Sequence, residues 1–210
     1  MFSYYIDKDY KPKFSVLPPR KDQVNNNKSL DKDVSDEEHK PLDIDSVIIN
    51  EQQAAWISQK IMELRNDSTC KLTLLYRHSR DGSIEKFQQQ CRNREPTVIV
   101  GKVLNSDEIL GGYNPTCWMQ SGWISTTESF IFSLDKENLE KSLVSFVTDY
   151  DKAIFVGLYP RFGDSDLDFG FGLKCKFGYA KKKSYKFAIR PTFLGWFYWA
   201  DWEAFLVTKS

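Results

Sequence analysis

The chain has 210 residues, of which 41% are hydrophobic and 28% are charged, a composition that suits one sizeable soluble domain with polar sequence beside it. Its 29 Lys and Arg equal its 29 Asp and Glu, and this balance argues against nucleic-acid binding, because affinity for phosphates depends on a basic excess. The most apolar stretch, residues 193–200, is too short to cross a bilayer, and the N-terminal residues lack the pattern of a secretory signal. We therefore expect a cytoplasmic protein that does not insert into membranes.

The few histidines and the scattered cysteines predict neither a metal site nor a cofactor. The sequence has two histidines, and its four cysteines never form the C-x-x-C pair that is typical of a zinc site. In a reducing compartment the cysteines are expected to be free thiols. They are Cys70, Cys91, Cys117 and Cys175.

Two segments at the start of the chain differ from the rest. Residues 1–17 are rich in aromatic side chains, and we interpret them as the remnant of a preceding domain or as a segment that docks on the folded part. Residues 18–45 are polar and carry mixed charges, which predicts a flexible linker, because too few apolar side chains are present to offset the entropy of ordering. The folded domain is expected to span residues 46–210.

A helix is expected directly after Asn50. Asn50 and Gln53 have the spacing of a capping box, in which each residue satisfies a backbone N–H of the other. Apolar side chains then recur at helical intervals until residues 66–68 end the pattern. These side chains belong to Ala54, Ile57, Ile61 and Leu64.

The next segment predicts a strand, a turn and a second helix. Residues 71–76 are typical of a strand, and the polar residues 77–82 end in Asp81-Gly82, a common turn. Ser83 is the expected N-cap of a short helix, whose apolar face consists of Ile84, Phe87 and Cys91.

Strands then follow at short intervals. Residues 97–103 and 108–113 predict a hairpin, in which Gly111 and Gly112 allow a bend or the close approach of an aromatic ring. Residues 118–127 are expected to be irregular, whereas residues 138–146 fit either a short helix or a loop. Further strands are expected at residues 129–134, 153–158, 166–171, 174–179 and 199–207.

The closing strand has the clearest alternation. Its core face is expected to carry apolar side chains, and Asp201 and Glu203 are expected on an opposite face that is partly wet. The predicted core face consists of Tyr198, Ala200, Trp202, Ala204 and Leu206. Many short strands with few helices favour an α+β, mainly β fold, namely a two-sheet antiparallel β-sandwich flanked by a few short helices.

Three groups of side chains are candidates for chemistry. Asp164, Asp166 and Asp168 recur at every second position, but the later positions of a calcium loop hold Phe169 and Cys175, so that pattern fails. On a strand, Asp166 and Asp168 would share one face, which we expect to be the solvent face.

The second group is Arg80-Asp81 set against Glu108 or Glu203, where paired carboxylates could perform acid–base catalysis. A turn with surface ion pairs is the favoured role. The third group is Cys91 with His78 as its base, but Cys91 lies on an apolar helix face, which favours a buried, inert thiol.

We therefore predict no enzyme and no catalytic residue. Arg80, Asp81, Asp164 and Asp166 are the candidate contacts with a partner. The aromatic run at residues 193–199 fits either a partner-binding patch or the core, and the core is favoured. The run Lys181-Lys182-Lys183 is expected to be a solvated loop tip.

An ordered set of short motifs adds a resemblance. The set consists of Leu74 to Arg77, Ser79 to Gly82, Phe87, Cys91, Pro96 to Val98, Gly111 to Tyr113, Trp118, Phe130 to Ser133, Phe162 to Leu167, and Asp201, Glu203, Phe205 and Val207. In this order the motifs resemble the TLDc domain of oxidation-resistance proteins, over about residues 46–210. His78 stands where that family often has glycine, and residues 176–196 match weakly.

The resemblance implies a β-sandwich with flanking helices, a role in protection against oxidative stress and, in several relatives, binding to peripheral subunits of the vacuolar proton pump (V-ATPase) and control of its assembly. It also implies that Gly82, Gly111, Gly112, Gly163 and Glu203 are structural positions of the motif. The start of the chain is similar to fungal proteins in which BTB and BACK domains precede a TLDc domain, so that residues 1–17 would be the end of a BACK domain.

Two alternatives remain beside an interaction module. One is a thiol- or carboxylate-dependent enzyme for peroxide removal or hydrolysis, and the other is a substrate adaptor of a BTB-type ubiquitin ligase. The sequence leaves the oligomeric state open.

Overall fold

The computed structural model describes residues 44–170, 176–190 and 195–209. The predictions for residues 1–17 and for nearly all of the linker at 18–45 concern residues outside these ranges. Within the described residues, no helix combines the length and the apolar character needed to cross a bilayer.

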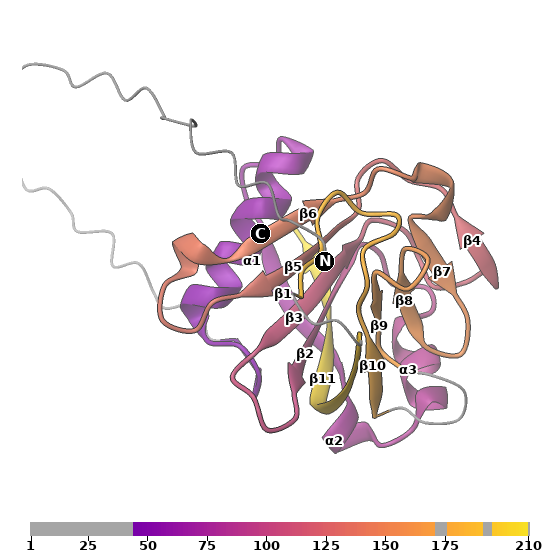
Figure 1. The fold of residues 1–210 in the computed structure, drawn as a ribbon, viewed down its shortest axis with the longest axis horizontal. Helices are drawn as coiled ribbons and strands as arrows, with labels where there is room; N and C mark the ends of the chain where they lie inside the picture. Colours follow the sequence, from indigo (N-terminus) through magenta and orange to yellow (C-terminus); the bar gives the residue numbers. More distant parts are fainter. Residues whose placement is uncertain (1–43, 171–175, 191–194, 210) are drawn as a thin grey trace, which may run out of the picture. The chain divides into compact units, whose positions relative to one another are not determined.

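Eleven strands within the described ranges form two layers, and every neighbouring pair is antiparallel (Figure 1). They are β1 (Lys71–Arg77), β2 (Thr97–Val103), β3 (Ile109–Asn114), β4 (Gly122–Ile124), β5 (Phe130–Leu134), β6 (Leu143–Phe146), β7 (Ile154–Val156), β8 (Pro160–Phe162), β9 (Leu167–Asp168), β10 (Phe177–Tyr179) and β11 (Trp196–Thr208). The main sheet has the order β1-β11-β2-β3-β5-β6, and the second sheet has the order β4-β7-β8-β9-β10-β11. The predicted mainly-β, two-sheet architecture is confirmed.

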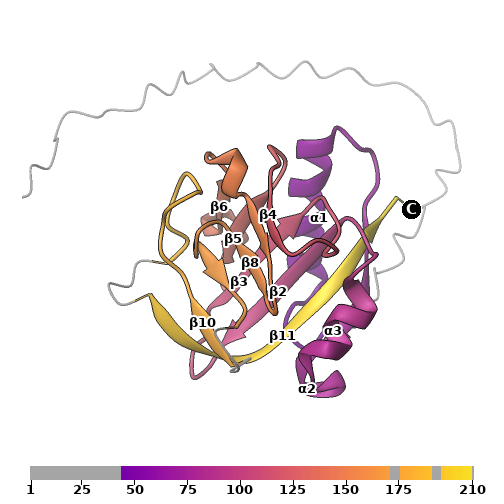
Figure 2. The ribbon, with the colours of Figure 1, turned by 90° about the vertical axis from the view of Figure 1, so that its right-hand side faces the viewer.

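Strand β11 belongs to both sheets, as its long diagonal course in Figure 2 shows. Residues 196–198 pair with β10 in the second sheet, and residues 199–206 pair with β2 in the main sheet. Between Trp199 and Asp201 the register shifts, which is the mark of a β-bulge. The bulge brings Trp199 and Trp202 into the same apolar cluster, although three positions separate them.

The bulge changes the face assignment that the sequence predicted for this strand. Trp202 and Ala204 are buried as expected, but the prediction for Tyr198 and Ala200 is wrong, because both are exposed. An alternation counted back from Trp202 places them inside, whereas the extra residue at the bulge turns them outside. Glu203 is also fully buried, since a helix layer covers the face that was expected to be partly wet.

That helix layer is α1 (Glu51–Arg65), which begins and ends as predicted. The Asn50 side chain accepts the N–H of Gln53 at 2.9 Å, and the Gln53 side chain accepts the N–H of Asn50 at 3.0 Å, so the capping box is confirmed. Asn66 ends the helix in a left-handed conformation. Apolar side chains of α1, such as Ile57 and Ile61, form one core cluster with the outer face of the main sheet.

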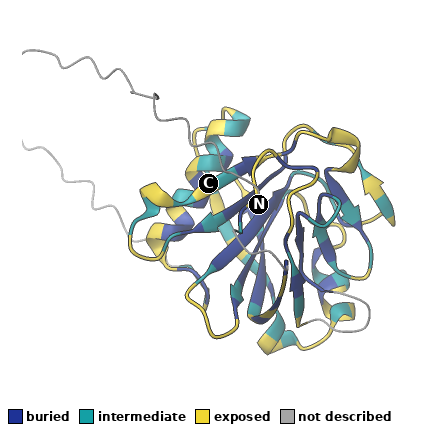
Figure 3. Cartoon of the chain, in the orientation of Figure 1, coloured by how far each residue is buried: buried dark blue, intermediate teal, exposed yellow. Residues whose placement is uncertain are grey.

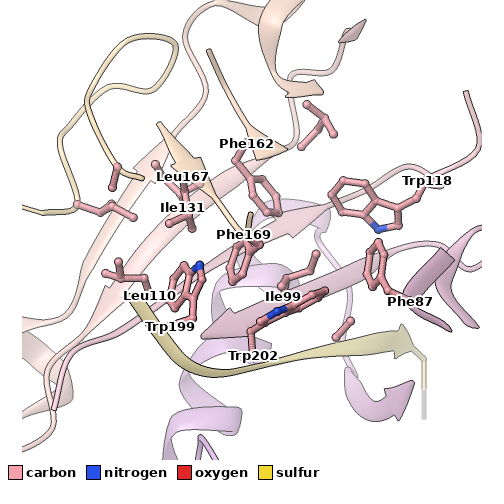
Figure 4. Packing of buried hydrophobic residues seen from close by; sticks show 14 of the residues in the cluster. Phe87, Ile99, Leu110, Trp118, Ile131, Phe162, Leu167, Phe169, Trp199 and Trp202 are labelled. Atoms are coloured by element: carbon pink, nitrogen blue, oxygen red, sulfur yellow. The ribbon is translucent and has the colours of Figure 1, made fainter. Parts of the chain in front are cut away.

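The other face of the main sheet packs on the second sheet through a cluster of aromatic rings (Figure 4). The Phe169 ring stacks on Trp199, with centroids 4.7 Å apart and planes inclined by 1°. Trp202 lies against Tyr76 and Phe87 at centroid distances of 4.7 and 5.3 Å. Figure 3 shows the strands around this cluster largely in the colour of buried residues.

Two adjacent glycines of β3 make this close packing possible. A Cβ at Gly111 would overlap the Phe132 ring and lie 2.6 Å from the Ile99 carbonyl oxygen, and a Cβ at Gly112 would lie 2.7 Å from the Phe162 ring. The predicted close approach of aromatic rings is therefore confirmed, with one ring on each face of the sheet.

Several short segments differ from the expected elements. The polar connection after β1 contains a helical turn, α2 (His78–Asp81), before the predicted α3 (Ile84–Cys91), which Ser83 caps. Residues 138–146 form a 3-10 turn, Leu139–Lys141, and then strand β6, and the irregular segment 118–127 contains β4. A second 3-10 turn covers Tyr150–Lys152. Each of these pieces is so short that its tertiary neighbours, rather than its own pattern, decide its conformation.

Candidate interaction surface

Arg80 and Asp81, two of the predicted partner contacts, form an ion pair at α2. Arg80 Nε and Nη2 donate to the two Asp81 carboxylate oxygens at 3.0 and 2.8 Å, and the Asp81 carboxylate also accepts the N–H of Arg77 at 2.8 Å. The hydrogen bond from Arg80 lowers the pKa of Asp81. Asp81 therefore ties the helical turn to β1, and Gly82, at a φ of +83°, lets the chain leave that turn.

Neither Glu108 nor Glu203 joins this pair. Glu108 instead pairs with Arg190 at 2.7 Å. The buried Glu203 carboxylate accepts Arg77 Nε at 2.5 Å, Ser46 Oγ at 2.5 Å and the N–H of Val47 at 3.1 Å. These bonds hold the residues that precede α1 against β11. They give a physical reason for the structural role that the resemblance implied for Glu203.

Asp164 and Asp166 lie together, and both face residues 183–185. Asp164 is half-exposed and pairs with Lys183 at 3.3 Å. Asp166 is buried, and its carboxylate accepts the N–H groups of Lys183, Ser184 and Tyr185 at 2.7, 2.7 and 3.0 Å. The left-handed Gly163 leaves room for this carboxylate, because a side chain at that position would overlap it. The carboxylate of Asp166 is thus bound by backbone N–H groups inside the domain, and its role as a partner contact stays a prediction.

Asp168 is also buried, at 2% exposure, so the prediction of a shared solvent face is wrong for both carboxylates. Asp168 lies on β9 of the second sheet, and its side chain is buried beside Arg161 of the neighbouring strand β8. Arg161 Nε lies 3.2 Å from Asp168 Oδ1, but that oxygen accepts no hydrogen bond from the described residues. Burial raises the pKa of Asp168 to about 6, and Arg161 only partly opposes the shift.

This shift makes a prediction for stability. The folded state holds the Asp168 proton up to about pH 6, whereas an unfolded aspartate loses it near pH 4, so stability is lost as pH rises through this window. We expect Asp168→Asn to be more favourable by about 2 kcal/mol at pH 7.5 than at pH 4.5, each value taken relative to the unchanged chain. Urea unfolding at the two pH values measures this difference, with the half-exposed Asp164→Asn as the control. Equal effects of Asp168→Asn at both pH values would contradict the raised pKa of Asp168.

The thiol candidate has the environment of a core residue. Cys91 is fully buried, and burial raises the pKa of its thiol to about 12, so the predicted buried thiol is confirmed. The His78 ring is hydrogen-bonded to Tyr76 at 2.9 Å and stacks on Trp202, and burial lowers its pKa. Cys70, Cys91 and Cys117 are free thiols, whereas Cys175 lies outside the described residues. In the described part of the chain, His, Cys, Asp and Glu side chains form no group of three that could hold a metal ion.

A group of aromatic side chains covers the outer face of the β10–β11 ribbon. Phe177 pairs with Tyr198, and Tyr179 pairs with Trp196, with ring centroids 4.4 and 4.5 Å apart. Trp196 is 46% exposed and Tyr198 is 50% exposed. We call these four residues the aromatic ribbon. Figure 2 shows the two strands at the end of β11 that lies opposite the C-terminus.

The geometry of the strand pair produces this exposure. Phe197 and Trp199 point to the core, where Phe197 packs on Gly178 and receives the Arg190 guanidinium at 4.4 Å from its centroid. Their neighbours Trp196 and Tyr198 must therefore point to solvent, because strand side chains alternate. The expectation that the run 193–199 belongs to the core is correct for Phe197 and Trp199 and wrong for Trp196 and Tyr198, while Phe193 lies outside the described residues.

The alternation of side chains in the sequence contains the signal for this surface, but reading it correctly requires knowledge of the β-bulge in β11. Counting the alternation forward from Trp196, instead of backward from Trp202, gives the observed faces. The predicted solvated tip at Lys181-Lys182-Lys183 is confirmed, since all three lysines are exposed.

A comparison with known protein families shows to which family the chain belongs. The TLDc domain matches residues 42–194, which is well over half of the chain. The chain belongs to the TLDc domain family. This TLDc family is associated with resistance to oxidative stress. A comparison with curated proteins found no match.

The matched range places the TLDc features on the structure. It contains the ion pair of Arg80 with Asp81, the β3 glycines and the buried Asp166, and it starts four residues before the expected boundary at residue 46. It ends before β11, so Trp196 and Tyr198 of the aromatic ribbon lie beyond the matched residues. The BTB and BACK relationship of the first residues stays a prediction.

Proposed function

We propose that this TLDc domain is a non-catalytic protein-interaction module that binds its partner through the aromatic ribbon. The observation that carries the proposal is the exposure of Trp196 and Tyr198 on one strand ribbon, where each pairs with a half-buried aromatic side chain of β10. Large aromatic side chains dominate the binding energy of protein interfaces, and a contiguous exposed apolar patch is typical of an interaction site.

The burial and hydrogen bonding of the ionisable groups support the same proposal. Glu203 and Asp166 are buried and each bind three donors, and Cys91 is a buried thiol with a raised pKa. These groups stabilise the fold, which leaves them poorly suited to nucleophilic or acid–base chemistry.

The partner that we propose is a peripheral subunit of the V-ATPase, on the basis of the resemblance described above. Binding to one assembly state of the pump, and less tightly to the other, would shift the equilibrium between assembled and dissociated pump by mass action. Protection against oxidative stress would then follow from control of the pump and would require no turnover by the domain itself.

The test compares two double variants in binding to purified peripheral subunits. Trp196→Ala with Tyr198→Ala is expected to weaken binding at least 30-fold, because two interface hot spots are removed. The matched control is Trp123→Ala with Tyr150→Ala, which removes the same residue types at 41% and 51% exposure on other elements. Its binding is expected to stay within about threefold of the unchanged domain.

Two results would contradict the proposal. Equal binding of both double variants would remove the aromatic ribbon as the interface. The absence of binding by the unchanged domain, to either assembled or dissociated pump, would remove the V-ATPase as the partner.

A further inference from the structure

A second surface feature lies on elements other than the aromatic ribbon. Helix α3, residues 118–121 and the β7–β8 turn enclose a pocket of about 200 Å³ that opens to solvent. The apolar wall consists of Phe87, Trp118, Val156 and Pro160, which are all buried in the domain. Figure 4 shows the Phe87 ring directly beside the Trp118 indole.

The wall of the pocket is held in a fixed position. The Trp118 indole N–H donates to the buried Thr97 hydroxyl at 2.9 Å, and its ring contacts Phe87 and Phe162 edge-on at centroid distances of 6.0 Å each. A pocket whose aromatic wall is already ordered loses little conformational entropy when a ligand enters.

The charge at the opening of the pocket is positive. Arg92 lines the pocket at the end of α3 and is exposed, and it forms no ion pair with any described residue. Among the described residues, no acidic side chain lines the pocket; its other polar groups come from Gln88, Ser121 and Tyr159. The site therefore complements an anion that is attached to an apolar body.

The volume limits the size of that body. A dry cavity of about 150 Å³ accommodates a benzene molecule, so this pocket has room for one ring and one carboxylate. A C-terminal aromatic residue supplies both groups within a single residue, whereas an internal acidic–aromatic pair would need two side chains. Met119 on the rim and Leu158 beside it are 49% and 54% exposed, and they offer contacts to the residues that precede such a terminus.

We propose that this pocket binds the C-terminal carboxylate of a partner polypeptide whose last residue is aromatic, with the ring on Trp118 and the carboxylate at Arg92. This recognition goes beyond the proposed function, and it rests on residues that the aromatic ribbon does not use. Capture of a chain terminus is a known mode of peptide recognition.

The test follows the indole N–H resonance of Trp118 by NMR during titration of the whole chain with a five-residue peptide that ends in phenylalanine. We expect saturable shifts with a Kd on the order of 0.1–1 mM, which suits so small a contact. The same peptide with a C-terminal amide is expected to bind at least tenfold more weakly, because it has lost the charge that faces Arg92.

Arg92→Gln is expected to weaken binding of the free-acid peptide about tenfold. The control, Arg94→Gln, removes another exposed arginine two positions away that is not among the residues lining the pocket, and it is expected to have no effect. Because Arg92 is exposed, the variant keeps the fold, and its other resonances verify this.

Three results would overturn the proposal: no shift of Trp118 at 10 mM peptide, equal binding of acid and amide, or equal binding by the Arg92 variant and its control. Tighter binding of 3-phenylpropionate than of the peptide would assign the pocket to a small organic acid instead. The peptide titration does not depend on V-ATPase binding or on Trp196 and Tyr198. Each of the two proposals can therefore be contradicted without the other.

Discussion

Replacing Glu203 with alanine is expected to lower the free energy of unfolding by about 4 kcal/mol. The substitution removes a fully buried carboxylate and leaves the guanidinium of Arg77, which is 13% exposed, without its main partner. It also frees the hydroxyl of Ser46 and the N–H of Val47, which hold the entry to α1. Breaking a buried ion pair from one side is costly because the remaining charge stays desolvated.

Urea unfolding at pH 7 measures the effect, and Asp45→Ala is the matched control. Asp45 binds the same Arg77 at 2.8 Å, but its side chain is 69% exposed, so its loss is expected to cost less than 1 kcal/mol. If Glu203→Ala cost no more than Asp45→Ala, the buried network would not be a main support of the fold.

Gly111→Ala is expected to destabilise the domain by about 3 kcal/mol. The added methyl group would overlap the Phe132 ring and would meet the Ile99 carbonyl oxygen at 2.6 Å, and that oxygen belongs to the neighbouring strand of the main sheet. A ring can turn aside, but the strand can move only if its ladder is distorted. In an open site the same substitution would be slightly stabilising, because alanine restricts the unfolded chain.

Thermal unfolding of Gly111→Ala beside Gly157→Ala tests this reasoning. At Gly157 the new Cβ meets only the side chain of Phe155, at 3.0 Å, and neither glycine has a positive φ. The control is therefore expected to lose less than 1 kcal/mol. A similar loss at both positions would mean that backbone contact is not what requires glycine at residue 111.

Much of the fold follows from local sequence signals. The capping box at Asn50, the N-cap at Ser83 and the strands predicted at 71–76, 97–103 and 129–134 depend on neighbouring residues, and the structure confirms them. The glycine pair at residues 111 and 112 predicted close packing because only glycine leaves that space.

The remaining features depend on contacts between distant residues. Asp166 is buried under residues 183–185, whose backbone N–H groups bind its carboxylate, and Asp168 is buried beside Arg161 of β8. Alternation within one strand cannot show whether its outer face is later covered. The aromatic ribbon depends on one extra residue at the bulge in β11, and the acidic partner of Arg77 lies 126 positions away. Such long-range pairings leave no periodic signal in the sequence.

The sharing of β11 between the two sheets has a mechanical consequence. Strand β11 continues through the bulge between Trp199 and Asp201 and is hydrogen-bonded to β10 on one side of it and to β2 on the other. A force applied to residues 196–198 is therefore transmitted along this single strand into the middle of the main sheet. A partner that pulls on Trp196 or Tyr198 therefore acts on the centre of the domain and not on a detachable flap.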